Sequence, residues 1–174
     1  MVRNLRDLQG REPVFIDADI FLCHAFDTSD DAIGFLRQVE SSSCHAATSS
    51  LVLEEVFFKL LMQSASNFME KVTVAKVKAV CRDDGTREAM LRPLGEYGEY
   101  LGILREAGMK VFELTGGDML SSVPIMQAHH LMVADAAHLA VMKRKKIRHL
   151  ASGDWDFAAV PEITVWSPAP AGKL

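Results

Sequence analysis

The sequence predicts a single α/β domain, a three-layer α/β/α sandwich around a short, mostly parallel central sheet. Three observations lead to this prediction. The chain has 174 residues, the size of one ordinary domain. Hydrophobic residues make up 49% of it and charged residues 24%, as expected of a chain with a sizeable core. Short β-prone runs alternate with helical patterns, which is typical of a parallel sheet covered by helices on both faces.

The first third of the chain establishes this alternation. Residues 14–16 (Val-Phe-Ile) read as a buried strand that runs into a turn and a helix. A capping-box pattern at 28–31 begins a second helix, which the serines at 41–43 end. A strand at 44–48 then leads into an apolar helix at 51–65, for which Ser49 or Ser50 is the expected cap.

The middle of the chain is helical but less regular. We expect a helical extension at about 66–107 with two or three helices, because Asp83-Asp84-Gly85 breaks the pattern and Pro93 interrupts it. After Gly108 a strand is expected at 109–114. A helix should follow Asp118, with Pro124 beginning a new turn.

The last part predicts a helix at 134–146 that ends in four basic residues, which suit the negative end of the helix dipole and read as a solvated helix end. Strands at 149–152 and 163–166 follow, and we expect a short flexible tail at 167–174. Residues 1–174 are therefore interpreted as one domain.

Composition and charge exclude several classes of protein. No apolar run reaches the roughly 18 residues of a membrane span, and the charged segment 1–13 is unlike a secretory signal, so we expect a soluble, cytoplasmic protein with no membrane partner. The three cysteines, Cys23, Cys44 and Cys81, form neither a disulfide framework nor a CxxC metal site. A net charge of −4 argues against broad electrostatic binding of nucleic acid, so any such contact is local or helped by a metal.

Paired acids follow two of the predicted strands. Asp17 and Asp19 come directly after the first strand, and Asp154 and Asp156 come after a late one. In a parallel sheet both pairs lie at the same edge, where such folds place their chemistry. Carboxylates repel one another there unless a cation compensates them, and hard oxygen ligands suit Mg²⁺ or Mn²⁺.

Two further acids can complete this cluster. Asp135 begins the helix at 134–146, where it could alternatively be only an N-cap. Glu55 lies on the helix at 51–65, where Lys59 at the i+4 position offers an ordinary surface ion pair instead. Glu54 points about 100° away from Glu55, so at most one of the two faces the cleft.

Four segments in order resemble the PIN-domain ribonucleases, whose best-populated branch is the VapC-type toxins. They are Ile16-Asp17-Ala18-Asp19-Ile20-Phe21-Leu22, then Thr48-Ser49 with Glu55-Val56, then Ala134-Asp135-Ala136-Ala137-His138-Leu139-Ala140, and Ser152-Gly153-Asp154-Trp155-Asp156-Phe157. The resemblance implies a metal-dependent endoribonuclease.

The resemblance also assigns roles to residues. It implies an acidic quartet of Asp17, Glu55, Asp135 and Asp154, with Asp156 as a further catalytic acid. Of these, Asp17, Asp135 and Asp154 are the expected metal ligands for Mg²⁺ or Mn²⁺. Asp19 and Ser152 are accessory: Ser152 matches the hydroxyl residue of the family's Thr-x-Asp pattern, whereas Asp19 replaces what is more often a small neutral polar residue.

The chemistry implied is hydrolysis of an RNA phosphodiester bond. One or two divalent ions would lower the pKa of a bound water and neutralise charge on the phosphate. Either Glu55 or Asp156 could accept the proton of that water. The resemblance further implies, as partners, an RNA substrate, an antitoxin protein that occludes the cleft, and a second copy of the chain in a homodimer.

Two other hypotheses compete with this one. In a haloacid-dehalogenase-type phosphatase, Asp17 would be the nucleophile and Asp19 the acid/base, but the late acids lie two residues apart instead of four. A non-catalytic PIN-fold module that binds a protein is the other. His129, His130 and His138 lie near the acids in sequence, but a hard-metal site does not need imidazole, so we expect His138 to be packed or hydrogen-bonded.

Overall fold

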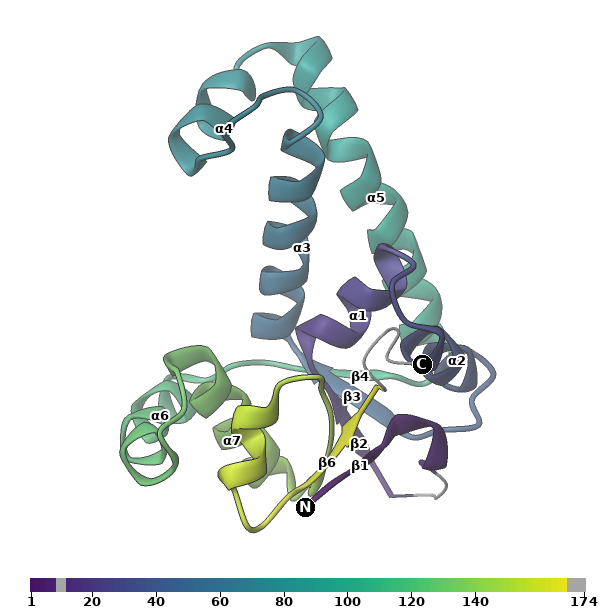
Figure 1. The fold of residues 1–174 in the computed structure, drawn as a ribbon, viewed down its shortest axis with the longest axis vertical. Coiled ribbons are helices and arrows are strands. Elements are labelled where there is room, and N and C mark those ends of the chain that lie inside the picture. Colours follow the sequence, from purple (N-terminus) through teal and green to yellow (C-terminus); the bar gives the residue numbers. More distant parts are fainter. Residues whose placement is uncertain (9–11, 169–174) are drawn as a thin grey trace.

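The computed structural model describes residues 1–8 and 12–168, and a six-stranded sheet lies at its centre (Figure 1). All five pairs of neighbouring strands are parallel, in the order β1-β6-β5-β2-β3-β4. The strands are β1 (Val2–Asn4), β2 (Val14–Ile16), β3 (Ala46–Ser49), β4 (Lys110–Phe112), β5 (His149–Ala151) and β6 (Thr164–Ser167).

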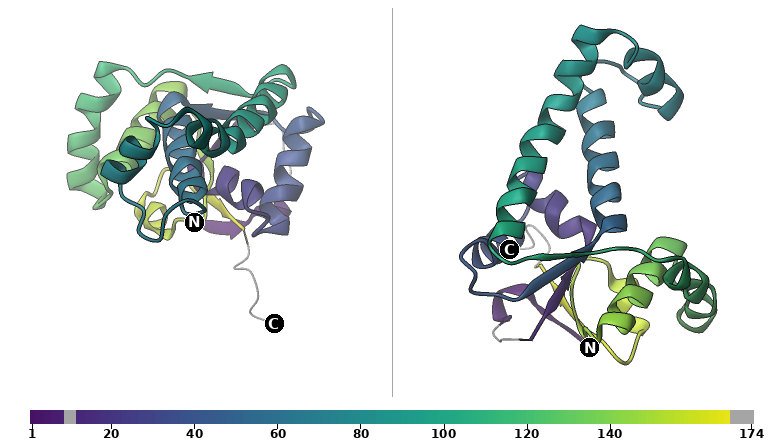
Figure 2. Two further views of the ribbon diagram at one scale, coloured as in Figure 1. Left: turned by 90° about the horizontal axis from the view of Figure 1, so that it is seen from above. Right: turned by 180° about the vertical axis from the view of Figure 1, so that it is seen from behind.

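Helices cover both faces of this sheet, so the predicted three-layer α/β/α architecture is confirmed (Figure 2). On one side lie α6 and α7, and on the other lie α1 and α2. Away from the sheet, α3 and α5 rise together as a long hairpin that carries α4 at its far end. The α-helices are α1 (Ala18–Ala25), α2 (Asp30–Glu40), α3 (Ser50–Ala65), α4 (Val74–Val80), α5 (Asp84–Glu106), α6 (Gly116–His129) and α7 (Val133–Lys145).

Strand β2 and the middle of helix α7 are buried at the centre of the fold. Strand β2 lies between β3 and β5, and its residues Val14, Phe15 and Ile16 are at most 1% exposed. Helix α7 is buried along its middle, from Ala136 to Met142, and several of these residues belong to the same hydrophobic core as β2. The chain reverses its direction of growth across the sheet at β2, since β3 pairs with one edge of β2 and β5 with the other. Such a switch point is where parallel sheets leave room for a ligand.

Both internal prolines were interpreted wrongly from the sequence. Pro93 lies inside α5 and Pro124 inside α6, and neither ends its helix. A proline removes one backbone hydrogen bond and bends a helix, but packing on either side can hold the helix together. In α5 the buried side chains of Met90 and Tyr97 flank Pro93 and provide that packing. The break expected at Asp83-Asp84-Gly85 is confirmed: α4 ends at Val80, and α5 begins at Asp84 after the cap Asp83, whose side chain accepts a hydrogen bond from the Thr86 amide.

Several boundaries also differ from the prediction. The N-cap of α2 is Ser29, not Thr28. Thr115 and Asp118 form a capping box at the start of α6, so this helix begins before Asp118. Strand β1 was not predicted because two of its three residues are polar, and it adds to the sheet only by pairing with β6. Ser167 belongs to β6, so the predicted tail begins later, and residues 169–174 lie outside the described residues.

Within the described ranges, none of the helices has the length and hydropathy needed to cross a lipid bilayer.

An ion pair fastens α6 to α7 on the outer face. Arg144, within the basic end of α7, donates from Nε to Asp118 Oδ1 and from Nη2 to Asp118 Oδ2, both at 2.8 Å. Arg144 Nη2 also reaches the Glu113 carbonyl at 2.8 Å. Asp118 is only 4% exposed, and these bonds hold its pKa at about 2. Arg144 is therefore a structural residue rather than part of a solvated helix end.

Replacing Arg144 should destabilise the fold in a pH-dependent way. At pH 7 we expect Arg144→Met to lower the free energy of unfolding by about 2–3 kcal/mol, because a buried carboxylate loses its partner. The folded pKa of Asp118, about 2, lies below the unfolded value of about 3.9, so the contribution is complete above roughly pH 5 and disappears as the pH falls through 4 toward 2. Urea unfolding at pH 7 and pH 3 measures both effects. The exposed Arg105→Met is the control, and equal losses in the two variants would contradict the account.

Candidate active site

Asp17 occupies the junction between β2 and α1. Its Oδ1 accepts a hydrogen bond from the Ala18 amide at 2.7 Å, which makes it the N-cap of α1. Its Oδ2 accepts a bond from the Ser152 hydroxyl at 2.8 Å. The side chain is buried, and burial raises the pKa of Asp17 despite these bonds. The capping role and a functional role are therefore compatible for this carboxylate.

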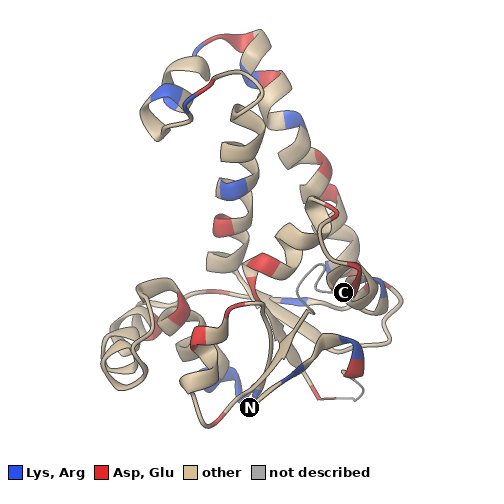
Figure 3. Ribbon diagram, viewed as in Figure 1, with Lys and Arg blue, Asp and Glu red and all other residues tan. Residues whose placement is uncertain are grey.

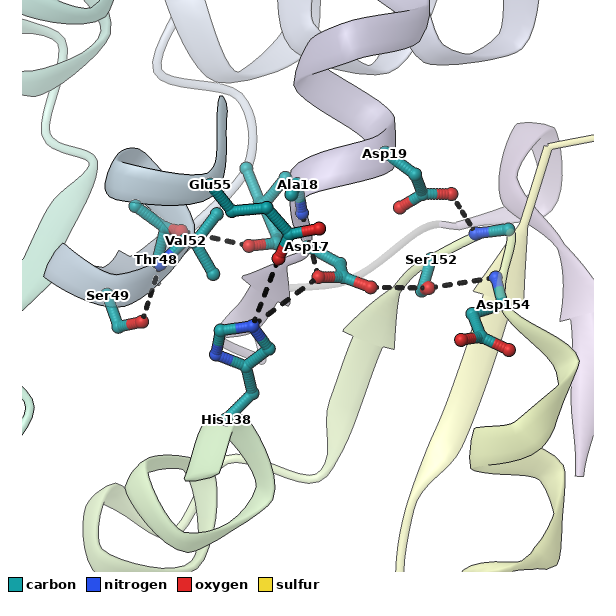
Figure 4. Close-up of polar contacts among 12 residues, drawn as sticks. Asp17, Ala18, Asp19, Thr48, Ser49, Val52, Glu55, His138, Ser152 and Asp154 are labelled. Atoms are coloured by element: carbon teal, nitrogen blue, oxygen red, sulfur yellow. Dashed lines mark hydrogen bonds and ion pairs between the residues drawn. The ribbon is translucent and has the colours of Figure 1, made fainter. Parts of the chain in front are cut away.

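Ser152 connects Asp17 to the acids that follow β5 (Figure 4). Its hydroxyl oxygen accepts a hydrogen bond from the Asp154 amide at 3.0 Å. Asp154 Oδ1 in turn accepts from the Asp156 amide at 2.8 Å, and this bond begins the short 3₁₀ helix η2 (Trp155–Ala159). A continuous chain of hydrogen bonds thus runs from the end of β2 to the turn after β5, while Asp156 itself is exposed.

Asp19 lies in the first turn of α1 and faces the turn that follows β5. Its Oδ2 accepts a hydrogen bond from the Gly153 amide, while its Oδ1 is buried without a hydrogen-bond partner among the described residues. Burial and the charge of Asp17 raise the pKa of Asp19 to about 7. Gly153 is required by this contact, since a Cβ at that position would lie 2.5 Å from Asp19 Oδ2.

Glu55, not Glu54, faces these acids. Glu54 is exposed, whereas Glu55 Oε2 lies 3.9 Å from Nε2 of His138, which is the same distance from Asp17 Oδ1. Glu55 Oε1 also forms the expected ion pair with Lys59, at 2.6 Å. The His138 ring and the Lys59 ammonium hold the pKa of Glu55 at about 2. Glu55 therefore forms the ion pair with Lys59 and also faces the acids of the site.

His138, which the sequence predicts to be packed or hydrogen-bonded, lies at the centre of this group. It is 1% exposed and packs against Phe15, with ring centroids 6.0 Å apart. At 3.9 Å its contacts with the two acids are too long for hydrogen bonds, and neither ring nitrogen has another partner in the described structure. It is packed, as expected, but not hydrogen-bonded. Its position three residues after Asp135 places both on one face of α7, which was the available signal.

Asp135 lies in the first turn of α7 and is not its cap, because the N-cap is Met132 and makes no side-chain bond. Burial raises the pKa of Asp135 to about 6, and the charges of Asp17 and Asp154 contribute to this rise. The acids are therefore close enough to repel one another. His129 and His130, at the end of α6, make no contact with these acids within residues 12–168.

The donor chemistry at this edge fits a divalent cation. Acidic segments gather where β2 and β5 end and where α3 and α7 begin (Figure 3). All are hard oxygen donors, and a buried Asp19 oxygen without a partner lies among them. As they stand, however, no three His, Cys, Asp or Glu side chains of the described residues converge into a ready-made metal site. The structure thus gathers the charges and the donor types without showing a coordination shell.

Comparison with known proteins finds one family model and several solved structures that are similar to this chain. The sequence model of the PIN domain matches residues 14–163. The fold is similar to a toxin–antitoxin complex from Klebsiella pneumoniae, with 16% identity, a TM-score of 0.55 and coverage of 86% of this chain and 94% of that one. It is also similar to VapBC2 from Rickettsia felis bound to a promoter DNA fragment, with 9% identity, a TM-score of 0.57 and coverage of 90% and 98%.

A third similar structure is Mycobacterium tuberculosis VapC20, a sarcin-ricin loop cleaving toxin, with 18% identity, a TM-score of 0.53 and coverage of 85% and 95%. At these identities the likeness shows a common fold. No curated protein sequence matches the chain.

The contact between Gly153 and Asp19 can be tested by a double-mutant cycle. Gly153→Ala should lower the free energy of unfolding by about 1–3 kcal/mol, because the new methyl group displaces the Asp19 carboxylate. In an Asp19→Ala background the same change should cost far less, with a coupling energy of at least about 1 kcal/mol. Gly95→Ala, where nothing lies within 4 Å, is the control. Additive effects in urea unfolding would show that the two residues do not meet.

Crowding of the acids predicts an unusual response to metal. In EDTA, Asp135→Asn should raise the melting temperature by roughly 2–4 °C, because it removes a repelled and half-buried charge. The rise in melting temperature that Mn²⁺ gives the wild-type protein should be smaller in this variant. Thermal unfolding by circular dichroism measures both, with the exposed Glu96→Gln as control. A lower melting temperature in EDTA together with an unchanged response to Mn²⁺ would refute the crowding.

Proposed function

The chain belongs to the PIN-domain family, and we propose that it is a metal-dependent endoribonuclease that hydrolyses RNA phosphodiester bonds. The observation that supports this most is the crowding of carboxylates where β2 and β5 end. Burial raises the pKa of Asp19 to about 7 and that of Asp135 to about 6, and the negative charge of Asp17 adds to both rises. Mg²⁺ or Mn²⁺ would provide the compensation that these oxygen donors require.

In this proposal Asp17, Asp135 and Asp154 hold one or two divalent ions. When bound, such an ion activates a water and neutralises charge on the phosphate oxygens. Ser152 positions two of the ligands at once, since its hydroxyl bonds both the Asp17 carboxylate and the Asp154 amide. Asp19 adds a further negative charge on the Gly153 side of the site.

Glu55 and Asp156 remain the two candidates for accepting the proton of the attacking water. Their surroundings differ: Glu55 is engaged by Lys59 at 2.6 Å and lies beside His138, whereas Asp156 is exposed. A carboxylate held at a pKa of about 2 is a weak proton acceptor, which favours Asp156 for that step and an electrostatic or ligand role for Glu55. His138, between Asp17 and Glu55, would then orient both.

The comparisons support a more specific role. Two of the similar structures are toxin–antitoxin complexes, and a third is a sarcin-ricin loop cleaving toxin. We propose by extension that this chain is the toxin of such a pair, with a protein antitoxin that covers the acidic site, and that it forms a homodimer. The reducing cytoplasm is the compartment we propose for it.

The phosphatase hypothesis finds less support. It uses Asp17 and Asp19 but leaves Glu55 and Asp135 without a task, although both lie within electrostatic reach of Asp17. The family match also extends over all four acidic segments. The non-catalytic module is the alternative that the following assay addresses.

Cleavage of RNA by purified protein tests the proposed activity. With Mg²⁺ or Mn²⁺ the wild-type chain should cut single-stranded or looped RNA, and EDTA should abolish the cutting. Asp17→Asn and Asp135→Asn should lower the rate at least about 100-fold, because each removes a ligand charge. Glu54→Gln, one residue from Glu55 but exposed, should cut like the wild type.

Three other outcomes would each contradict the proposal. Equal cutting by the aspartate variants would show that these carboxylates do not carry the activity. Turnover of an aryl phosphate without cleavage of RNA would favour the phosphatase. No activity on either substrate, together with tight binding of a small protein, would favour the binding module.

A further inference from the structure

Trp155 is the most exposed aromatic side chain next to the acids. It is 66% exposed and stands between Asp154 and Asp156 in the chain, whereas the other tryptophan, Trp166, is 5% exposed and donates a hydrogen bond to His149. An indole ring in water contributes nothing to the core and leaves a large apolar surface unsatisfied. The fold therefore gives no reason for a tryptophan at this position.

The turn that carries this ring is firmly held. The Asp154 amide bonds the Ser152 hydroxyl, and the Asp156 amide bonds the Asp154 carboxylate, so the residues on both sides of Trp155 are tied down. Two residues further on, Phe157 is fully buried, so its side chain attaches η2 to the hydrophobic core. The ring is thus presented to solvent by an ordered segment and is not merely part of a loose loop.

Hydrogen bonds connect this turn directly to the centre of the site. The same Ser152 hydroxyl that receives the Asp154 amide donates to Asp17 (Figure 4). Trp155 therefore directly follows, in the chain, a residue whose backbone amide is bonded to the hydroxyl that also contacts Asp17. Phe58, 43% exposed and three residues after Glu55 on α3, is a second exposed ring one helical turn from an acid of the site.

We propose that Trp155 stacks on an unpaired base of the RNA substrate beside the scissile phosphate. The inference rests on the proposed nuclease function and specifies its substrate. A nucleotide offers both parts that this turn can recognise: a phosphate for the cation at the acids and a flat apolar face for the indole ring. Bases in a duplex have no free face, so the site selects single-stranded or looped RNA over duplex RNA.

Binding is tested first, with cleavage suppressed. Ca²⁺ replaces Mg²⁺ so that a hard cation can occupy the carboxylates, and the probe is a short single-stranded RNA whose integrity is checked on a gel. We expect this RNA to quench the fluorescence of the wild-type protein. An abasic strand of equal length and charge should not quench it, and the Trp155→Phe variant, which retains only Trp166, should show no quenching.

The affinity for RNA should depend on the aromatic ring at position 155. By fluorescence anisotropy of a labelled RNA, Trp155→Ala should bind about 5- to 150-fold more weakly, while Trp155→Phe should stay much closer to the wild type because it retains a stacking surface. Phe68→Ala removes a ring that is 43% exposed and lies just after the end of α3 at Ala65, and this variant should bind like the wild type.

Kinetics separate stacking from a merely structural role. With Mg²⁺ and single-stranded RNA, Trp155→Ala should raise KM with a much smaller change in kcat, and Trp155→Phe should restore KM. Equal affinity for the abasic and the base-containing strand, or an unchanged KM in Trp155→Ala, would overturn the stacking proposal while leaving nuclease activity intact. A wild-type protein that binds and quenches with RNA but never cuts it would instead overturn the proposed function.

Discussion

The site depends on one constraint: several carboxylates must lie close together in a partly buried place where the chain provides few positive charges. Asp17 is the pivot of this arrangement, because it ends the central strand, caps α1 and receives the Ser152 hydroxyl at 2.8 Å. Burial raises the pKa values of the neighbouring Asp19 and Asp135, and the charge of Asp17 adds to both rises. Among the described residues, Lys59 forms a close ion pair only with Glu55, and His138 lies 3.9 Å from both Asp17 and Glu55, so the pKa values of Asp19 and Asp135 stay raised. The arrangement is understandable if a divalent cation belongs to it.

The fold creates this constraint through its topology. Parallel pairing of β5, β2 and β3 brings three segments to one edge, although the segment after β5 lies more than a hundred residues beyond the other two in the chain. The central position of β2 requires its residues to be fully buried, which in turn fixes where Asp17 emerges. The ion pair of Asp118 with Arg144 holds the α6–α7 layer, and so supports the position of Asp135 and His138 indirectly.

Much of this was predictable from the sequence, and the reasons are physical. The β2, β3 and β5 runs are short, apolar and followed at once by polar residues, so both the strands and the acids at their ends could be identified. Pro93 and Pro124 misled the prediction because their cost depends on tertiary packing, which local patterns do not contain. His138 was underestimated for a similar reason, since only the folded chain shows that its ring lies between Asp17 and Glu55. The choice between Glu54 and Glu55 required the actual rotation of α3, which places Glu54 in solvent.

The central claim is that these carboxylates bind a divalent cation, and a crystal grown with Mn²⁺ tests it most directly through the metal's anomalous scattering. We expect an anomalous peak coordinated by oxygens of Asp17, Asp135 and Asp154 at about 2.1 Å, with Ser152 still bonded to Asp17. A well-ordered structure at saturating Mn²⁺ in which these three carboxylates bind no ion would contradict the account.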